Sequence, residues 1–299
     1  MSLISLVKII NGKEEYSSGI LKSLELINYS FDKKIQNILI KPNLCYYWDN
    51  TTGQTTDPGF VAGLIEILRE KISHNVNISI IESDASAMKC KYVFKMLGYE
   101  RIAQKYNVKL VNLSECISDS VKIEIGDQFY ELLVPKIIEE SDLNINVPKI
   151  KYTMEPIKIT CALKNIFGCN AYSKKFELHN KLGEYIVAAN KAMKFDLCIG
   201  DGNIVSGINP RKLGLVMAGK DPVAFDTVAS EIAGINPKTI KYLQLASKES
   251  LGNKSFSLKG VPISYFKSKY PKKNMEKQMM SLAYRVVNQI GLGKRLGLS

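Results

Sequence analysis

The sequence predicts an α/β protein: a mostly parallel twisted sheet flanked by helices, with a small antiparallel hairpin insertion and a basic C-terminal helical tail. Short β-rich runs alternate with longer helix-like runs, which is typical of βαβ units. Asp-Pro and Asn-Pro pairs mark helix starts, and the 45% hydrophobic and 23% charged content is that of a globular chain. We divide the 299 residues into a single α/β domain over 1–260 and the basic amphipathic tail over 261–299.

The first half of the chain supplies three predicted strands, at 37–43, 76–84 and 108–114. Helix-like runs at 57–72 and 91–106 separate them, as crossover connections in a parallel sheet require. The segment 120–135 has a different pattern. It alternates around Gly126-Asp127, which predicts the hairpin.

The runs at 141–151, 160–168, 195–202 and 213–219 continue the alternation. Helices are predicted to begin at Pro58, Pro222 and Pro237, because an Asp or Asn cap accepts the first free amides and proline at the first helical position loses no bond. Gly234 is predicted to end the second of these helices. Asp57 and Asp221 are therefore caps, or they belong to a site at the helix starts.

Polar residues stand where four of the predicted strands end. Because the carboxyl ends of parallel strands share one edge of a sheet, these side chains can converge on one cleft. They are Lys41 and Asn43; Glu82, Ser83 and Asp84; Lys149 and Lys151; and Asp201, Gly202 and Asn203.

The residue types at this edge define three candidate roles. Lysines and amides suit a carboxylate or phosphate, and the substrate-binding candidates are Lys41, Asn43, Thr56, Lys149, Lys151 and Asn165. Carboxylates can bind a hard divalent cation such as magnesium, and the metal-ligating candidates are Glu82, Asp84 and Asp201. The catalytic candidates are Lys164, His179 and Asp226.

Each catalytic candidate also has a structural interpretation. Lys164 follows an apolar run, so it reaches into a pocket or extends to water. His179 is one of two histidines, and a lone histidine is commonly a surface or core residue. Asp226 lies among apolar helix neighbours and therefore needs a partner; we expect a strand-tip lysine, in a pairing that can be purely architectural.

Several classes of protein are disfavoured by what the sequence lacks. It has neither a phosphate-binding P-loop nor a Gly-x-Gly-x-x-Gly fingerprint. The six cysteines include no Cys-x-x-Cys pair, so we expect no iron–sulfur cluster on this chain. The net charge of +12 is compatible with nucleic-acid binding. However, much of that charge lies in residues 266–299, which hold eight basic residues and one acidic residue, and the sequence contains no nucleic-acid-binding motif.

The tail has the apolar spacing of one helix face, at Met275, Met279, Leu282, Val286 and Ile290. It either docks on the domain or makes peripheral contact with an anionic membrane. No secretory signal or membrane-spanning run is recognised, so a cytoplasmic location is expected.

In the order of its motifs, the chain resembles the family called domain of unknown function 362. The matching stretches, between about residues 36 and 252, are "IKPNL", "TTDP", "VPKIK", "ALKNIFG", the histidine of "ELHN", "DGN…G…P" and "AGKDPVAFDTVA". The resemblance implies an α/β domain whose activity is generally unassigned. Many relatives carry a ferredoxin-like module with two four-iron clusters, which implies a redox setting.

The chain departs from the family pattern in two ways. It is a stand-alone member without the ferredoxin-like cysteine run, so a cluster would belong to a separate ferredoxin-like partner. The family's Lys-x-His appears here as Lys151-Tyr152-Thr153, which leaves His179 as the only histidine that matches a family motif.

These observations predict an enzyme that acts on a small anionic substrate, a carboxylate or a phosphate, in the strand-tip cleft. It would be a metal-assisted acid/base enzyme or one associated with oxidoreductases in a redox pathway. The alternatives are a non-catalytic accessory protein that binds an iron–sulfur redox partner or an anionic membrane surface, and a nucleic-acid binder that acts through the tail.

Overall fold

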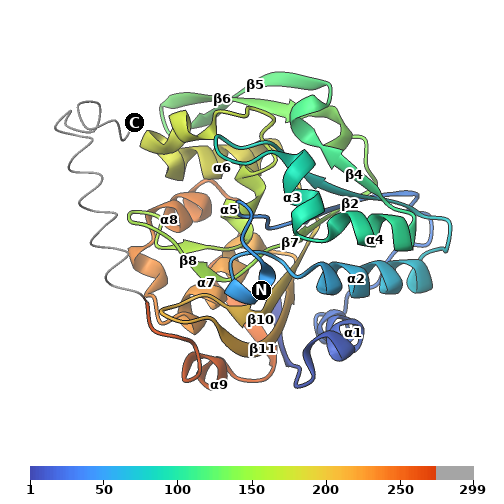
Figure 1. The fold of residues 1–299 in the computed structure, drawn as a ribbon. Coiled ribbons are helices and arrows are strands. Elements are labelled where there is room, and N and C mark those ends of the chain that lie inside the picture. Colours follow the sequence, from blue (N-terminus) through green and yellow to red (C-terminus); the bar gives the residue numbers. More distant parts are fainter. Residues whose placement is uncertain (274–299) are drawn as a thin grey trace.

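The computed structural model describes residues 1–273 and contains an eight-stranded sheet (Figure 1). The strand order is β12-β1-β11-β10-β7-β2-β3-β4. Every strand except β11 runs in the same direction, so the sheet is mostly parallel as predicted. The strands are β1 (Ser2–Lys8), β2 (Asn37–Pro42), β3 (Asn77–Glu82), β4 (Lys109–Asn112), β7 (Leu143–Val147), β10 (Leu197–Val205), β11 (Arg211–Gly219) and β12 (Phe256–Gly260).

Helices cover both faces of the sheet and enclose two hydrophobic cores. One core packs the sheet against α1 (Tyr16–Leu26), α2 (Pro58–Lys71), α3 (Cys90–Met96) and α4 (Tyr99–Tyr106). The other packs the opposite face against α5 (Ala162–Phe167), α6 (Leu182–Ala192), α7 (Pro222–Ile232), α8 (Lys241–Lys248) and α9 (Ile263–Lys267). Because both faces are buried, the central strands read as nearly continuous apolar runs.

The predicted helix starts agree with the structure at two of three positions. Asp57 caps α2 by accepting from the Gly59 amide, and Asp221 caps α7 by accepting from two amides. Gly234 follows α7 with a φ of +72°, a conformation that favours glycine. Pro237 begins only a single 3-10 turn, Pro237–Thr239, capped by Asn236, and α8 starts afterwards at Lys241.

The predicted helix over 91–106 is two helices. Gly98 stands between α3 and α4 with a φ of +81°, so the chain turns there instead of continuing one helix. The prediction of a single helix was wrong because the apolar spacing continues across the turn that separates α3 from α4.

The predicted hairpin is confirmed. It consists of β5 (Ser118–Ile125) and β6 (Gln128–Pro135), which pair antiparallel in a separate two-stranded sheet. Gly126 occupies the turn with a φ of +60°. A second small sheet pairs β8 (Lys151–Tyr152) with β9 (Ile159–Thr160), just beyond the carboxyl end of β7.

Residues after 260 pack against the domain as far as the structure describes them. Phe266 on α9 is fully buried, and the Tyr270 hydroxyl donates to the Ile150 carbonyl at 2.9 Å. The predicted apolar helix face, from Met275 to Ile290, lies outside the described residues. Within residues 1–273, no helix has the length and apolar character needed to span a membrane.

Candidate functional site

The carboxyl ends of β2, β3, β7 and β10 lie at one edge of the sheet, and a buried ion pair stands among them. Lys41 near the end of β2 contacts Glu82 at the end of the adjacent strand β3, with Nζ 2.8 Å from Oε2. Both side chains are buried. Lys41 Nζ also donates to the Pro42 carbonyl at 2.6 Å. The predicted convergence of strand-tip charges is therefore present at this pair.

A network of asparagines connects this edge to helix α5. Asn165 Nδ2 donates to Asn146 Oδ1 on β7 at 2.8 Å and to the Lys41 carbonyl at 3.1 Å. Asn165 Oδ1 accepts from Asn43 Nδ2 at 2.9 Å. Asn43 Oδ1 is buried and accepts no hydrogen bond from any described residue. The amides thus fix α5 against β2 and β7 and leave one buried acceptor unsatisfied.

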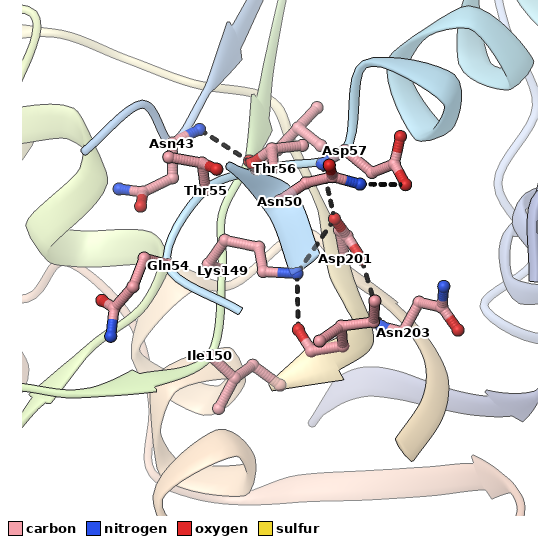
Figure 2. Close-up of polar contacts among 12 residues, drawn as sticks. Asn43, Asn50, Gln54, Thr55, Thr56, Asp57, Lys149, Ile150, Asp201 and Asn203 are labelled. Atoms are coloured by element: carbon pink, nitrogen blue, oxygen red, sulfur yellow. Dashed lines mark hydrogen bonds and ion pairs between the residues drawn. The ribbon is translucent and has the colours of Figure 1, made fainter. Parts of the chain in front are cut away.

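A second buried ion pair joins the segment after β7 to strand β10 (Figure 2). Lys149 Nζ lies 3.1 Å from Asp201 Oδ2 and donates to the Ile204 carbonyl at 2.8 Å. Asp201 also accepts from the Asp57 amide at 2.9 Å, where α2 begins. Lys149 and Asp201 therefore hold the start of α2 against β10.

Asp57 is more than a helix cap. Its Oδ2 accepts from the Tyr16 hydroxyl at 3.0 Å. It also accepts from Asn50 Nδ2 at 2.5 Å (Figure 2). Burial, followed by the nearby negative charge of Asp201, raises the pKa of Asp57. The side chain therefore links α1 to the segment before α2, and the Asp57 backbone amide links the start of α2 to β10.

Three further lysines at this edge have no carboxylate within ion-pair distance among residues 1–273. Lys151 Nζ donates to the Gln54 carbonyl at 2.6 Å. Lys175 Nζ donates to Ser83 Oγ at 2.7 Å and to the Asp84 carbonyl at 2.6 Å. Lys164, on α5, makes neither a hydrogen bond nor an ion pair with the described residues. We call Lys151, Lys164 and Lys175 the unpaired lysines.

The unpaired lysines are energetically unfavourable as cations. Burial is the main cause that lowers the pKa of Lys164 to about 8, and the positive charges of Lys151 and Lys41 lower it further, against an opposing effect of Cys45. Burial likewise lowers the pKa of Lys175 to about 8 and lowers that of Lys151. Lys164 is half-buried, whereas Lys151 and Lys175 are buried. Lys164 is thus the most accessible of the three.

The predicted metal ligands are not brought together. Glu82 pairs with Lys41 and Asp201 pairs with Lys149, whereas Asp84 contacts Lys89 at 2.8 Å and accepts from the Cys90 amide at the start of α3. Within residues 1–273, no group of three or more histidine, cysteine or acidic side chains is placed to hold a metal ion. The shared-site prediction fails because each carboxylate is engaged by a different lysine.

Asp226 has a different partner from the one expected. Its oxygens accept from the Ala162 amide at 2.7 Å and the Leu163 amide at 3.2 Å, at the start of α5. Burial raises the pKa of Asp226 to about 7, and these two amides oppose the increase. No described lysine forms an ion pair with it, so the expected lysine partner was wrong and Asp226 positions α5.

The remaining predicted residues fall into two groups. Thr56 is used internally, because its hydroxyl donates to the Val147 carbonyl and accepts from the Asn43 amide, each at 2.9 Å. His179 is exposed on a 3-10 segment, Lys175–Lys181, with its Nδ1 3.0 Å from the Lys175 carbonyl oxygen. The His179 ring therefore contacts the backbone of Lys175, four residues earlier in the same segment.

Sequence reasoning missed Lys175 and Asn146. Asn146 carried a usable signal, since it is a polar residue inside the short apolar strand 143–147 and is buried there. Lys175 lies in a segment without strand or α-helix periodicity, and its approach to Ser83 depends on the fold.

Two open surface cavities lie away from the unpaired lysines. One, of about 430 Å³, is lined by residues that include Ser2, Lys220 and Gly252. The other, of about 420 Å³, lies between the hairpin and α8 and includes Gly126 and Leu245. Neither is lined by Lys41, Lys149 or Lys151, whose ammonium groups donate to backbone carbonyls at the strand tips.

Comparison with known proteins identifies one family model and one curated relative. The model described as "Domain of unknown function (DUF362)" matches residues 38–231. A thylakoid-associated protein of Synechocystis sp. (strain ATCC 27184 / PCC 6803 / Kazusa) is 29% identical over 241 residues. The match covers 75% of this chain and 70% of that protein.

The solved structures described next are similar to this chain at low sequence identity. The lactate racemase apoprotein of Thermoanaerobacterium thermosaccharolyticum matches with a TM-score of 0.46 and 12% identity, over 79% of this chain and 58% of that one. A protein of Thermotoga maritima matches with a TM-score of 0.40 and 13% identity, over 79% and 59%. This chain therefore spans less than two thirds of either structure.

Proposed function

Because the chain belongs to the family of the domain of unknown function 362, whose model matches residues 38–231, we propose a function for the part of the sheet that this match includes. The protein is an enzyme that binds a small anionic substrate, a carboxylate or a phosphate, beside the unpaired lysines. Lys164 makes the first contact with the anion, because it is half-buried and has no partner among the described residues.

The charge balance at the strand tips carries this proposal. Five lysines gather there, and two carboxylates, Glu82 and Asp201, lie within ion-pair distance of two of them. Buried or half-buried ammonium groups without a counter-ion are costly, and a bound anion removes that cost. A ligand with two or more oxygens also suits lysine donors, which bind phosphates and carboxylates as point charges.

Lys164 also supplies a group for proton transfer. With a pKa of about 8, it is present in both the protonated and the neutral form near neutral pH. General acids and bases work best when their pKa lies near the working pH. Lys164 can therefore bind an anion in one form and accept a proton in the other.

Calorimetric titration with inorganic phosphate and with acetate tests the proposal. We expect wild type to bind at least one of them, and Lys164→Ala to bind it about tenfold more weakly or worse, since a charged hydrogen bond contributes about 1.5–3 kcal/mol. Lys33→Ala is the matched control, because Lys33 is exposed at the opposite, amino-terminal side of β2. Undiminished binding by Lys164→Ala would place the anion elsewhere.

Turnover separates an enzyme from a binding protein. The anion that binds most tightly defines the compounds to be assayed, and Lys164→Ala should lose activity while keeping the wild-type circular dichroism spectrum. Binding without turnover of any compound in that class would favour the accessory protein over the enzyme.

A further inference from the structure

We propose that Lys164 is a covalent attachment site, at which its Nζ forms an imine with the carbonyl carbon of a small oxo-carboxylate. The inference rests on the proposed function, because the carboxylate of such a compound would occupy the anion site. It adds a reaction class and a nucleophile, neither of which anion binding requires.

The position of Lys164 suits a nucleophile. Its side chain is half-buried and makes no hydrogen bond or ion pair with residues 1–273, whereas Lys41 and Lys151 both donate to backbone carbonyls. A nucleophilic amine needs a free electron pair, and Lys164 is the lysine at this edge whose amine makes no hydrogen bond or ion pair within residues 1–273.

The backbone on both sides of Lys164 is held in place. The Leu163 amide donates to Asp226, and the Leu163 carbonyl accepts from Asn190 Nδ2 at 2.8 Å. Asn165 is fixed by its bonds to Asn146 and to the Lys41 carbonyl. The amine thus extends from a rigid support, as precise positioning of a nucleophile requires.

The neighbouring cations favour both the nucleophile and its substrate. Positive charges near a lysine favour its neutral form, which is the form that attacks a carbonyl. Lys151 lies close enough for its positive charge to lower the pKa of Lys164, so its ammonium would supply a counter-charge for the substrate carboxylate beside the Lys164 amine.

The reaction balances without an oxidant or a reductant. The lone pair of neutral Nζ forms a bond to the carbonyl carbon, and the carbonyl π electrons move to oxygen, which takes up a proton. The nitrogen loses its protons as the hydroxyl leaves as water, and a C=N bond forms. The products are one imine and one water molecule.

Reductive trapping tests the inference. The full chain is incubated with pyruvate as the probe and sodium cyanoborohydride, which reduces an imine to a stable secondary amine, and the modified lysine is identified by peptide mass spectrometry. We expect one dominant adduct, on Lys164, that forms at least about tenfold faster than adducts on exposed Lys33, because more of the Lys164 amine is neutral. Inorganic phosphate should slow it by competition.

Two variants distinguish failure of the imine from failure of the anion site. Lys164→Arg keeps the positive charge and removes the nucleophile, so it should lose the adduct and still bind phosphate within a few fold of wild type. Lys33→Arg should keep both. Phosphate protection is measured on wild type, so the test does not depend on folding of a variant.

The labelled lysine and the effect of the anion together decide between the two proposals. If wild type binds phosphate but Lys164 is labelled no faster than Lys33, the imine is overturned and the anion site remains. If neither phosphate nor acetate binds and neither slows the labelling of Lys164 by pyruvate, both proposals are overturned. If labelling is fast at Lys151 or Lys175 instead, Lys164 is not the nucleophile.

Discussion

Lys164 combines three properties that are seldom found in one residue: partial burial, neighbouring cations and no partner among the described residues. Each is explained by its position on α5, whose first amides are held by Asp226 and whose next residue, Asn165, bonds to β2 and β7. A lysine on a solvent-exposed helix would reach water and keep its ordinary pKa. Here the helix points the lysine at the edge where Lys41 and Lys151 already lie.

The pKa of Lys164 leads to a prediction about stability and pH. Folding lowers this pKa from the ordinary lysine value of 10.5 to about 8, so the unfolded chain binds more protons between those two values. Folding stability should therefore increase with pH across that window. In Lys164→Met the increase should be smaller than in wild type, as measured by urea unfolding at about pH 8 and pH 10.

Lys33→Met is the control for this measurement. Lys33 is exposed, so its removal should leave the pH dependence of unfolding unchanged. Equal slopes for wild type and Lys164→Met would show that the Lys164 ammonium is well solvated in the folded state.

At the residue scale, the sequence predicted contacts correctly where the parallel direction of neighbouring strands brings their ends together. Lys41, Glu82, Lys149 and Asp201 were expected to meet because parallel strands end at one edge, and they form two ion pairs there. The partner of Asp226 could not be predicted in the same way. The carboxylate oxygens of Asp226 accept from backbone amides of α5. Every residue except proline has such an amide, so the residue types in the sequence do not identify the donor.

At the scale of elements, α5 depends on one side chain from a different helix. It has six residues, too few to be stable alone in water, and its first amides donate to Asp226 of α7. The link between α5 and α7 therefore determines where Lys164 and Asn165 lie.

Removal of the Asp226 carboxylate should destabilise the protein and disturb the site together. Asp226→Ala leaves two buried amides without their acceptor, at about 1–3 kcal/mol for each unsatisfied group. We expect a lower free energy of unfolding in urea and weaker phosphate binding, because α5 loses its anchor.

Glu231→Ala provides the comparison on the same helix. Glu231 is half-buried on α7 and makes no ion pair among the described residues, so its removal should change the free energy of unfolding by less than about 1 kcal/mol. A similar loss in both variants would mean that α7 itself, not the contact with α5, is the sensitive element.

Element boundaries were predictable where local chemistry sets them. Asp57-Pro58 and Asp221-Pro222 begin helices because cap and proline act within one turn. Asn236-Pro237 has the same pair but begins only a 3-10 turn, since α8 starts separately at Lys241. Strands β1 and β12 were not predicted, because their partners lie far away in the sequence.

The whole molecule should respond to anions in its stability. A ligand that binds only the folded state stabilises it by about 2.7 kcal/mol at 100 times its Kd. We expect the melting temperature of wild type to be higher in phosphate than in sodium chloride of equal ionic strength.

Phosphate also stabilises folded proteins in general, because it strengthens the burial of apolar surface. The comparison of wild type with Lys164→Ala separates that general effect from binding at the site. In Lys164→Ala the difference between phosphate and chloride should shrink, and in Lys33→Ala it should not. An identical difference in all three proteins would assign the effect to the solvent.

Strand β1 lies between β11 and β12, and its residue Ile4 is paired with Gly219 on one side and Leu258 on the other. During synthesis, residues 2–8 leave the ribosome long before either neighbour has been translated. Loops of this length close slowly, and long-range pairing delays folding. The backbone donors and acceptors of β1 therefore stay unpaired until almost the entire domain has been synthesised. During that time they can form hydrogen bonds with non-native strands.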